Sequence, residues 1–174
     1  MLSPFLSHFA KCSRGAAAVE MALVTPMLMV LLFGSFEMGN YFLQNHVVAK
    51  AVRDGARYAA RRSFEEYPSC APSSDVERET RNVTRTGVVS NGGTPRIANW
   101  TVLDPVTGVN TIVVTASCDT SGSYTGIYTG VAIGAPQVTV TASVTYDSLF
   151  ARFGLIANGT FTLRAQSQAA VMGV

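Results

Sequence analysis

The stretch GAAAVEMALVTPMLMVLLFGSFEM, residues 15–38, decides the fold of this 174-residue chain. It contains no charged residue between Met21 and Phe36. Its apolar run of about 21 residues makes roughly 31 Å of helix, which is enough to cross the hydrocarbon core of a bilayer. Pro26 removes one backbone hydrogen bond, and we expect a bend there. The stretch therefore predicts a transmembrane helix over residues 16–38.

The flanking charges predict the direction of this helix. Residues 1–15 carry Lys11 and Arg14 and no acidic residue. The positive-inside rule then places the N-terminus in the cytoplasm and the C-terminal domain outside it. The alternative is an ordinary secretory signal peptide, whose apolar region is shorter and free of acidic residues. Glu20 and the length of the run argue against that alternative.

Composition narrows the classes of function. The chain is 48% hydrophobic and 14% charged, and its net charge of +2 gives no reason to expect nucleic acid as a partner. The three cysteines and two histidines lack the spacing of a metal site, so neither a metal nor another cofactor is expected. No nucleophile elbow, phosphate loop or His-Glu-x-x-His motif occurs in the sequence. We therefore expect no enzyme and no small-molecule substrate.

Residues 39–66 continue the helical pattern beyond the apolar run and predict an exported extension of the same helix. We expect one helix from about Ala16 to about Phe64, because no strong stop precedes Pro68. Arginines recur at helical spacing along one face. They could be solvated, contact lipid headgroups, or pair with Asp54 or a neighbouring subunit, and we favour the first two. The small or apolar residues of the other face are Val47, Ala51, Gly55 and Ala59.

Residues 67–174 predict a β-rich extracytoplasmic domain. Three segments alternate between apolar and polar residues, as half-buried antiparallel strands do: Ile112–Cys118, Val138–Tyr146 and Phe161–Ala165. A short helix from Asp75 to Thr86 is expected, started by Ser74 or Asp75. The predicted fold class is α+β, with a long N-terminal helix whose exported half packs on a small antiparallel sheet.

The cysteines divide between the two sides of the membrane. Cys12 lies in the reducing cytoplasm, whereas Cys70 and Cys118 lie together in an oxidising compartment. We predict a disulfide between Cys70 and Cys118. Two independent buried thiols are the alternative.

Glu20 is the most informative residue, because a carboxylate inside an apolar segment is costly and suggests a function. It could also lie at the membrane interface beside Arg14. The pattern Lys11-Cys-Ser-Arg-Gly15-Ala-Ala-Ala-Val-Glu20, followed by an apolar run, resembles that of type IV prepilins. The resemblance implies cleavage between Gly15 and Ala16 by a prepilin peptidase. It also implies that Glu20 meets the freed amine of a neighbouring subunit and sets the register during assembly.

Further residues make the resemblance more specific. Residues 13–62 resemble the TadE-like family of the tight-adherence (Tad, or Flp) pilus systems. Met21 departs from the family, which often has an aromatic residue there. Besides the prepilin-like start, the residues that carry the resemblance are Glu37 and the helix motif Arg53, Gly55, Ala56, Arg57, Tyr58 and Ala59.

This family resemblance implies a pilin-like fold and a minor pilin or pseudopilin that takes part in pilus assembly for surface adherence. The implied location is the bacterial inner membrane, with the C-terminal domain periplasmic. The implied partners are the peptidase and other pilin or secretion-machine subunits. Two alternatives stay open: an uncleaved single-pass scaffold of the same machine, and an anchored binding domain unrelated to pili.

Overall fold

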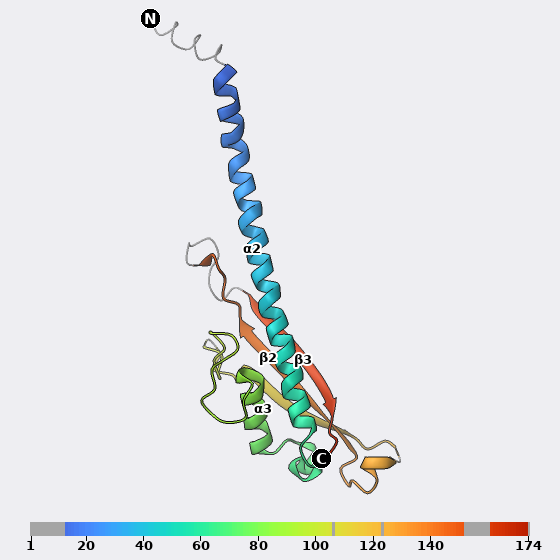
Figure 1. The fold of residues 1–174 in the computed structure, drawn as a ribbon. Coiled ribbons are helices and arrows are strands. Elements are labelled where there is room, and N and C mark those ends of the chain that lie inside the picture. The colour runs from blue at the N-terminus through green and yellow to red at the C-terminus, as the bar shows by residue number, and fades with distance from the viewer. Residues whose placement is uncertain (1–12, 106, 123, 152–160, 174) are drawn as a thin grey trace, which may run out of the picture. The chain divides into compact units, whose positions relative to one another are not determined.

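The computed structural model describes residues 13–105, 107–122, 124–151 and 161–173 (Figure 1). The chain divides into two compact units, Met1–Asn40 and Tyr41–Val174. Helix α2, Ser13–Ala60, contributes its first part to one unit and its second part to the other. Leader residues 1–12, which include Lys11 and Cys12, lie outside the described residues. The side chains of Ser13, Arg14 and Ala16 lie outside the described part as well.

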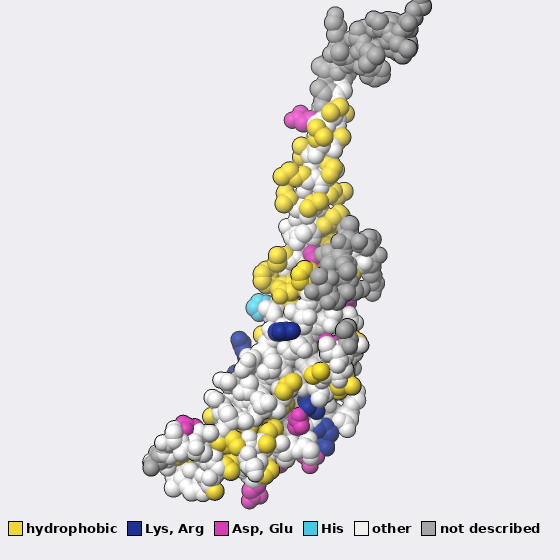
Figure 2. Space-filling model, turned by 180° about the vertical axis from the view of Figure 1, so that it is seen from behind, with side chains coloured by type: hydrophobic (Ala, Val, Ile, Leu, Met, Phe, Trp, Pro, Cys, Tyr) yellow, Lys and Arg dark blue, Asp and Glu magenta, His cyan; other side chains and the backbone are white. Residues whose placement is uncertain are grey.

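In the first unit, helix α2 exposes its apolar side chains. Alanine, leucine and methionine favour a helix here, and Pro26 lies within it. Among the described residues one helix, over Ala17–Ala60, is long and apolar enough to cross a membrane. Its most apolar window has a mean hydropathy of 2.0 and no buried residue. Hydrophobic side chains gather along this part of the helix in Figure 2.

The second unit contains a sheet of three antiparallel strands, ordered β1-β2-β3. The register aligns Val114, Val140 and Ser167 on one face, and Thr115, Thr139 and Gln168 on the other. The first face is mostly apolar and buried, and the second is polar, as predicted from the alternation. The strands are β1 Ile112–Asp119, β2 Ala135–Thr145 and β3 Thr162–Ala170.

The predicted α+β fold is confirmed, because the second half of helix α2 and the sheet form one hydrophobic core. Val48, Ala51 and Val52 of helix α2 are buried in the same cluster as Val138 and Leu163 of the sheet. Trp100 and Tyr67 are the largest fully buried side chains of this core. One apolar residue departs from the prediction: Phe161 is 52% exposed and precedes strand β3.

Helix α3, Ser74–Thr86, confirms the predicted short helix, but its start differs by a residue. The cap is Ser73, whose Oγ accepts a hydrogen bond of 3.3 Å from the amide of Val76. Gly87 ends the helix at φ 84°, a left-handed conformation that favours glycine. The described part of the chain also contains three short 3₁₀ helices: η1 Phe64–Glu66, η2 Pro68–Cys70 and η3 Gly126–Tyr128.

Helix α2 ends at Ala60, earlier than the predicted Phe64. The amides of Arg61 and Arg62 bond to the carbonyls of Tyr58 and Ala59, which tightens the last turn. The carbonyl of Ala60 instead accepts a hydrogen bond of 2.7 Å from the amide of Met172. A residue from the far end of the chain therefore satisfies the helix end, and no local sequence signal predicts this partner.

Candidate functional site

The predicted cleavage position lies in the first turn of helix α2. The helix begins at Ser13, so Gly15 and Ala16 are both helical, and Gly15 is exposed. Nothing lies within 4 Å of the place where a Cβ on Gly15 would be. Cleavage between the two residues would require this part of the helix to unwind locally.

Glu20 lies one turn further along the same helix and is exposed. Its neighbours Val19 and Met21 are 62% and 64% exposed, so the carboxylate stands among apolar side chains. Glu20 has no hydrogen bond or ion pair to any residue that the structure describes. A charge of this kind is expensive in a membrane without a partner. The carboxylate is therefore available to a group from outside the chain.

The polar side chains deeper in the apolar segment bond to their own helix. The hydroxyl of Thr25 donates to the carbonyl of Met21 at 2.6 Å, and that of Ser35 donates to Leu31 at 2.7 Å. Such bonds are what a hydrocarbon environment demands, since no water is present to accept them. This segment can thus lie in lipid with its hydroxyls satisfied.

Three small residues of the family motif are packed inside the second unit. Ala56 and Ala59 are buried in the core, and Gly55 is buried beside helix α3. A Cβ on Gly55 would overlap Oγ1 of Thr84 and lie 3.3 Å from its Cβ. Glycine is required because the two helices approach too closely for a methyl group.

The two arginines of the motif point the other way. Arg53 and Arg57 are exposed and have no ion pair among the described residues. Asp54, one of the partners considered from the sequence, instead pairs with Arg96 at 2.9 Å. The arginines therefore remain accessible to solvent, lipid headgroups or another subunit.

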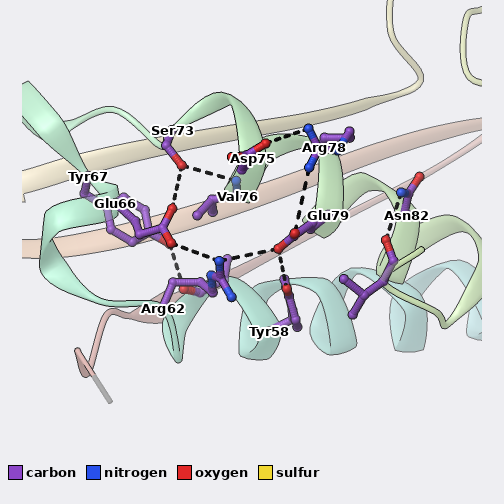
Figure 3. A network of polar contacts seen from close by, with 12 residues as sticks. Tyr58, Arg62, Glu66, Tyr67, Ser73, Asp75, Val76, Arg78, Glu79 and Asn82 are labelled. Carbon is purple, nitrogen blue, oxygen red and sulfur yellow. Dashed lines mark hydrogen bonds and ion pairs between the residues drawn. The ribbon is translucent and has the colours of Figure 1, made fainter. Parts of the chain in front are cut away.

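Tyr58 of the motif opens a polar network that joins three segments (Figure 3). Its hydroxyl donates to Glu79 of helix α3 at 2.6 Å. Arg62 lies between two carboxylates, 2.9 Å from Glu66 and 3.6 Å from Glu79. The hydroxyl of Ser73 also donates to Glu66 at 2.7 Å. The network fixes the end of helix α2 to both η1 and helix α3.

Two tyrosines near this network have raised pKa values. Burial raises the pKa of Tyr67 from 10.0 to about 12, and the charge of Glu66 adds to the effect. Burial and the hydrogen bond to Glu79 likewise raise the pKa of Tyr58 to about 12. The hydroxyl of Tyr67 donates to the carbonyl of Ala59 at 2.7 Å, close to the helix end. Both hydroxyls are therefore held in their neutral, donating form.

Cys70 and Cys118, the pair predicted from the sequence, are joined by a disulfide in the structure. Their Cα atoms are 5.8 Å apart, and the bridge links η2 to strand β1. Ser69 and Cys70 both have positive φ values, 52° and 63°, so the backbone turns sharply at the bridge. The bridge thus fastens the segment that follows helix α2 to the sheet.

The structure brings only part of the predicted site together. Gly55, Ala56, Tyr58 and Ala59 meet helix α3 and the core, whereas Gly15 and Glu20 lie in the first unit. Glu37, also in that unit, is half-buried. Among the described residues no group of three or more His, Cys, Asp or Glu could hold a metal ion. Sequence reasoning missed the polar network around Tyr58, although Arg62 and Glu66 have the spacing of a helical ion pair. The missed members of this network are Arg62, Glu66, Ser73 and Glu79.

Helix α2 is similar to a known protein family. Residues 15–57 match the family model of TadE-like proteins. The match confirms the resemblance stated from the sequence and covers helix α2 from Gly15 to Arg57. It supports a Tad pilus-associated protein with an apolar N-terminal helix. No curated protein and no solved structure matches the chain.

The TadE-like segment contains both the features expected for assembly and the small residues that pack closely in the second unit. It includes the apolar run with Glu20 and the close-packing residues up to Ala56. The sheet, the disulfide and helix α3 lie outside the match. The part of the chain that matches the family's pattern is therefore helix α2 up to Arg57.

Proposed function

We propose that this protein is a minor pilin or pseudopilin that takes part in assembly of a Tad pilus for surface adherence. Its role is structural and not catalytic. The observation that carries the proposal is Glu20, an exposed carboxylate in the apolar, TadE-like helix with no partner among the described residues. Association with the pilus machinery and a membrane helix agree with the family match.

In this proposal the leader is removed by a prepilin peptidase between Gly15 and Ala16. Cleavage leaves the α-amine of Ala16 as a cation at the start of the helix. The carboxylate of Glu20 from one subunit then pairs with this amine on a neighbouring subunit. A low dielectric strengthens the pair, and a misplaced subunit leaves a charge unpaired in lipid. The pairing therefore selects one register between helices.

The N-terminus lies in the cytoplasm and the C-terminal domain outside the inner membrane. The polar network around Tyr58 and the Cys70–Cys118 bridge support this role, because they fix the exported end of the helix to a folded domain. The helix makes the contacts with other pilin or secretion-machine subunits. The domain supplies the exposed surface.

The test is replacement of Glu20 in cells that make the pilus. Glu20→Gln keeps the shape of the side chain and removes the charge, so membrane insertion should persist while pilus number falls by about tenfold or more. Glu65→Gln is the matched control, because Glu65 is also exposed and also lacks a described partner. Pili are counted by electron microscopy, and insertion is checked by membrane fractionation. Normal pilus numbers in Glu20→Gln cells would contradict the assembly role.

An uncleaved scaffold of the same machine is the second candidate, favoured by the start of helix α2 at Ser13, before the proposed cleavage position. The intact mass of the protein purified from its native membrane separates the two. A chain that begins at Ala16 supports the pilin, and a chain that begins at Met1 supports the scaffold. Neighbouring genes for a secretion ATPase and a prepilin peptidase are expected in either case.

A further inference from the structure

A pocket of about 250 Å³ opens beside helix α3 in the second unit. It lies where this helix faces the turn at Asn91 and the segment that leads into strand β1. Its volume is below the roughly 300–1,000 Å³ of pockets for drug-sized ligands, so it suits a group about as large as one sugar ring. The lining residues that matter are Arg78, Arg81, Arg85, Asn91, Val102 and Ile112.

Two of the three arginines already have carboxylate partners. Arg78 lies 2.6 Å from Asp75 and 3.9 Å from Glu79, as Figure 3 shows. Arg81 pairs with Glu77, and its Nε donates to the carbonyl of Ile112 at 3.2 Å. These contacts hold both guanidinium groups in place and offset their charge.

Arg85 is different, because its guanidinium group has no hydrogen bond or ion pair to any described residue. It is half-buried on the pocket side of helix α3. The pocket therefore presents one uncompensated positive charge. This charge matches a singly charged carboxylate better than a phosphate, which carries a second charge near neutral pH.

The remaining lining offers hydrogen bonds and an apolar surface. Nδ2 of Asn82 donates to the carbonyl of Val89 at 3.0 Å and to Oδ1 of Asn91 at 2.8 Å. Asn91 is thereby oriented, and the two donors of its own amide group have no partner among the described residues. Val102 is 51% exposed at the pocket, and Ile112 is buried below it. A ligand that combines a carboxylate, hydroxyls and a C–H face would use all three kinds of surface.

We propose that this pocket binds the carboxylate-bearing ring of an acidic sugar, with Arg85 as the carboxylate ligand. Asn91 donates to a ring hydroxyl or to the same carboxylate, and Val102 contacts the apolar face of the ring. The inference goes beyond pilus assembly. It concerns the second unit alone and does not depend on the pairing proposed for Glu20.

The test uses the purified full-length protein in a non-ionic detergent and isothermal titration with sodium glucuronate. One site with a dissociation constant on the order of 1 mM is expected, as is usual for so small a ligand. Glucose serves as the uncharged match, and inorganic phosphate as an anion without a ring. Both should bind about tenfold more weakly or worse, because each lacks one of the features recognised.

Variants of the lining residues test which side chains bind glucuronate. Arg85→Gln removes the charge and should weaken glucuronate binding by about tenfold. Asn91→Asp keeps the acceptor for Asn82 but repels the carboxylate, so it should weaken binding similarly. Arg61→Gln is the matched control, since Arg61 is an exposed arginine outside the pocket, and it should stay within about twofold. All variants are checked by thermal unfolding.

Several results would overturn the proposal. They are no glucuronate binding, glucose binding of equal strength, phosphate binding that is tighter than glucuronate, and undiminished glucuronate binding by folded Arg85→Gln and Asn91→Asp. The assay is made on isolated protein. A normal pilus count in Glu20→Gln cells would therefore leave this result unaffected.

Discussion

Gly55 of helix α2 lies so close to Thr84 of helix α3 that no side chain fits between them. Thr84 cannot easily move away, because it is fully buried and its hydroxyl donates to the carbonyl of Thr80 at 2.7 Å. The two helices can approach this closely only because Gly55 has no side chain. The packing of the family motif in this chain depends on that approach.

Replacement of Gly55 by alanine should destabilise the second unit by about 1–3 kcal/mol, because the added methyl group forces the helices apart. The free energy of unfolding is measured by denaturant titration in detergent. Gly39→Ala is the control in the same helix, since nothing lies within 4 Å of a Cβ added there. Alanine is the better helix former, so this variant should be neutral or slightly more stable. Equal stabilities for the two variants would contradict the packing described.

The hydroxyl of Tyr58 should contribute about 1 kcal/mol to stability through its bond to Glu79. Tyr58→Phe keeps the ring and removes this bond, and it leaves Glu79 with only its longer contacts to Arg62 and Arg78. Tyr41→Phe is the matched control, because the hydroxyl of Tyr41 has no described partner. The control should change the unfolding free energy by less than about 0.5 kcal/mol. If Tyr58→Phe lowers the free energy of unfolding no more than Tyr41→Phe does, the bond to Glu79 does not contribute to stability.

Stability should fall in alkaline solution because of Tyr67. Its pKa of about 12 in the folded protein exceeds the ordinary 10.0, so the folded state binds the proton more tightly than the unfolded state does. The resulting stability is fully present below pH 10.0 and is lost as the pH rises through about 12. Thermal unfolding at a series of pH values measures the decline. Tyr67→Phe should start less stable and show a shallower slope, and an unchanged slope would exclude Tyr67 as a cause.

Loss of the bridge between Cys70 and Cys118 should destabilise the second unit strongly. The bridge closes a loop with a sequence separation of 48 residues. The chain-entropy model gives about 4 kcal/mol for a loop of this size. The double variant with serine at both positions should therefore unfold at a much lower temperature, and reductant should have the same effect on the parent protein. Cys12→Ser is the control and should leave stability unchanged, and two free thiols at Cys70 and Cys118 would contradict the bridge.

The sequence was most informative where a pattern is local. The apolar run, the alternation in strands and the spacing of small residues on helix α2 each follow from the period of one element. No periodic pattern links Cys70 to Cys118. The prediction of their disulfide rests on the oxidising compartment that the two residues are expected to share. These predictions needed no knowledge of which elements lie side by side.

Contacts between distant segments could not be predicted in the same way. Glu79 contacts Tyr58 only because helix α3 packs against helix α2. The sequence around either residue gives no sign of a partner in the other helix. The pocket beside Arg85 likewise needs the turn at Asn91 and the start of strand β1 to meet one helix face. Phe161 was assigned to a half-buried strand because its alternation fits, yet it lies one residue before strand β3.

The hydrogen bond from the amide of Met172 to the carbonyl of Ala60 also limits the order in which the chain folds. The helix end is synthesised well before its donor, because Met172 lies far beyond Ala60 in the sequence. Until then the carbonyl of Ala60 can be satisfied only by water. Contacts so distant in sequence are closed late and slowly. Formation of the hydrogen bond between Met172 and Ala60 should therefore be among the last events on the way to the native state.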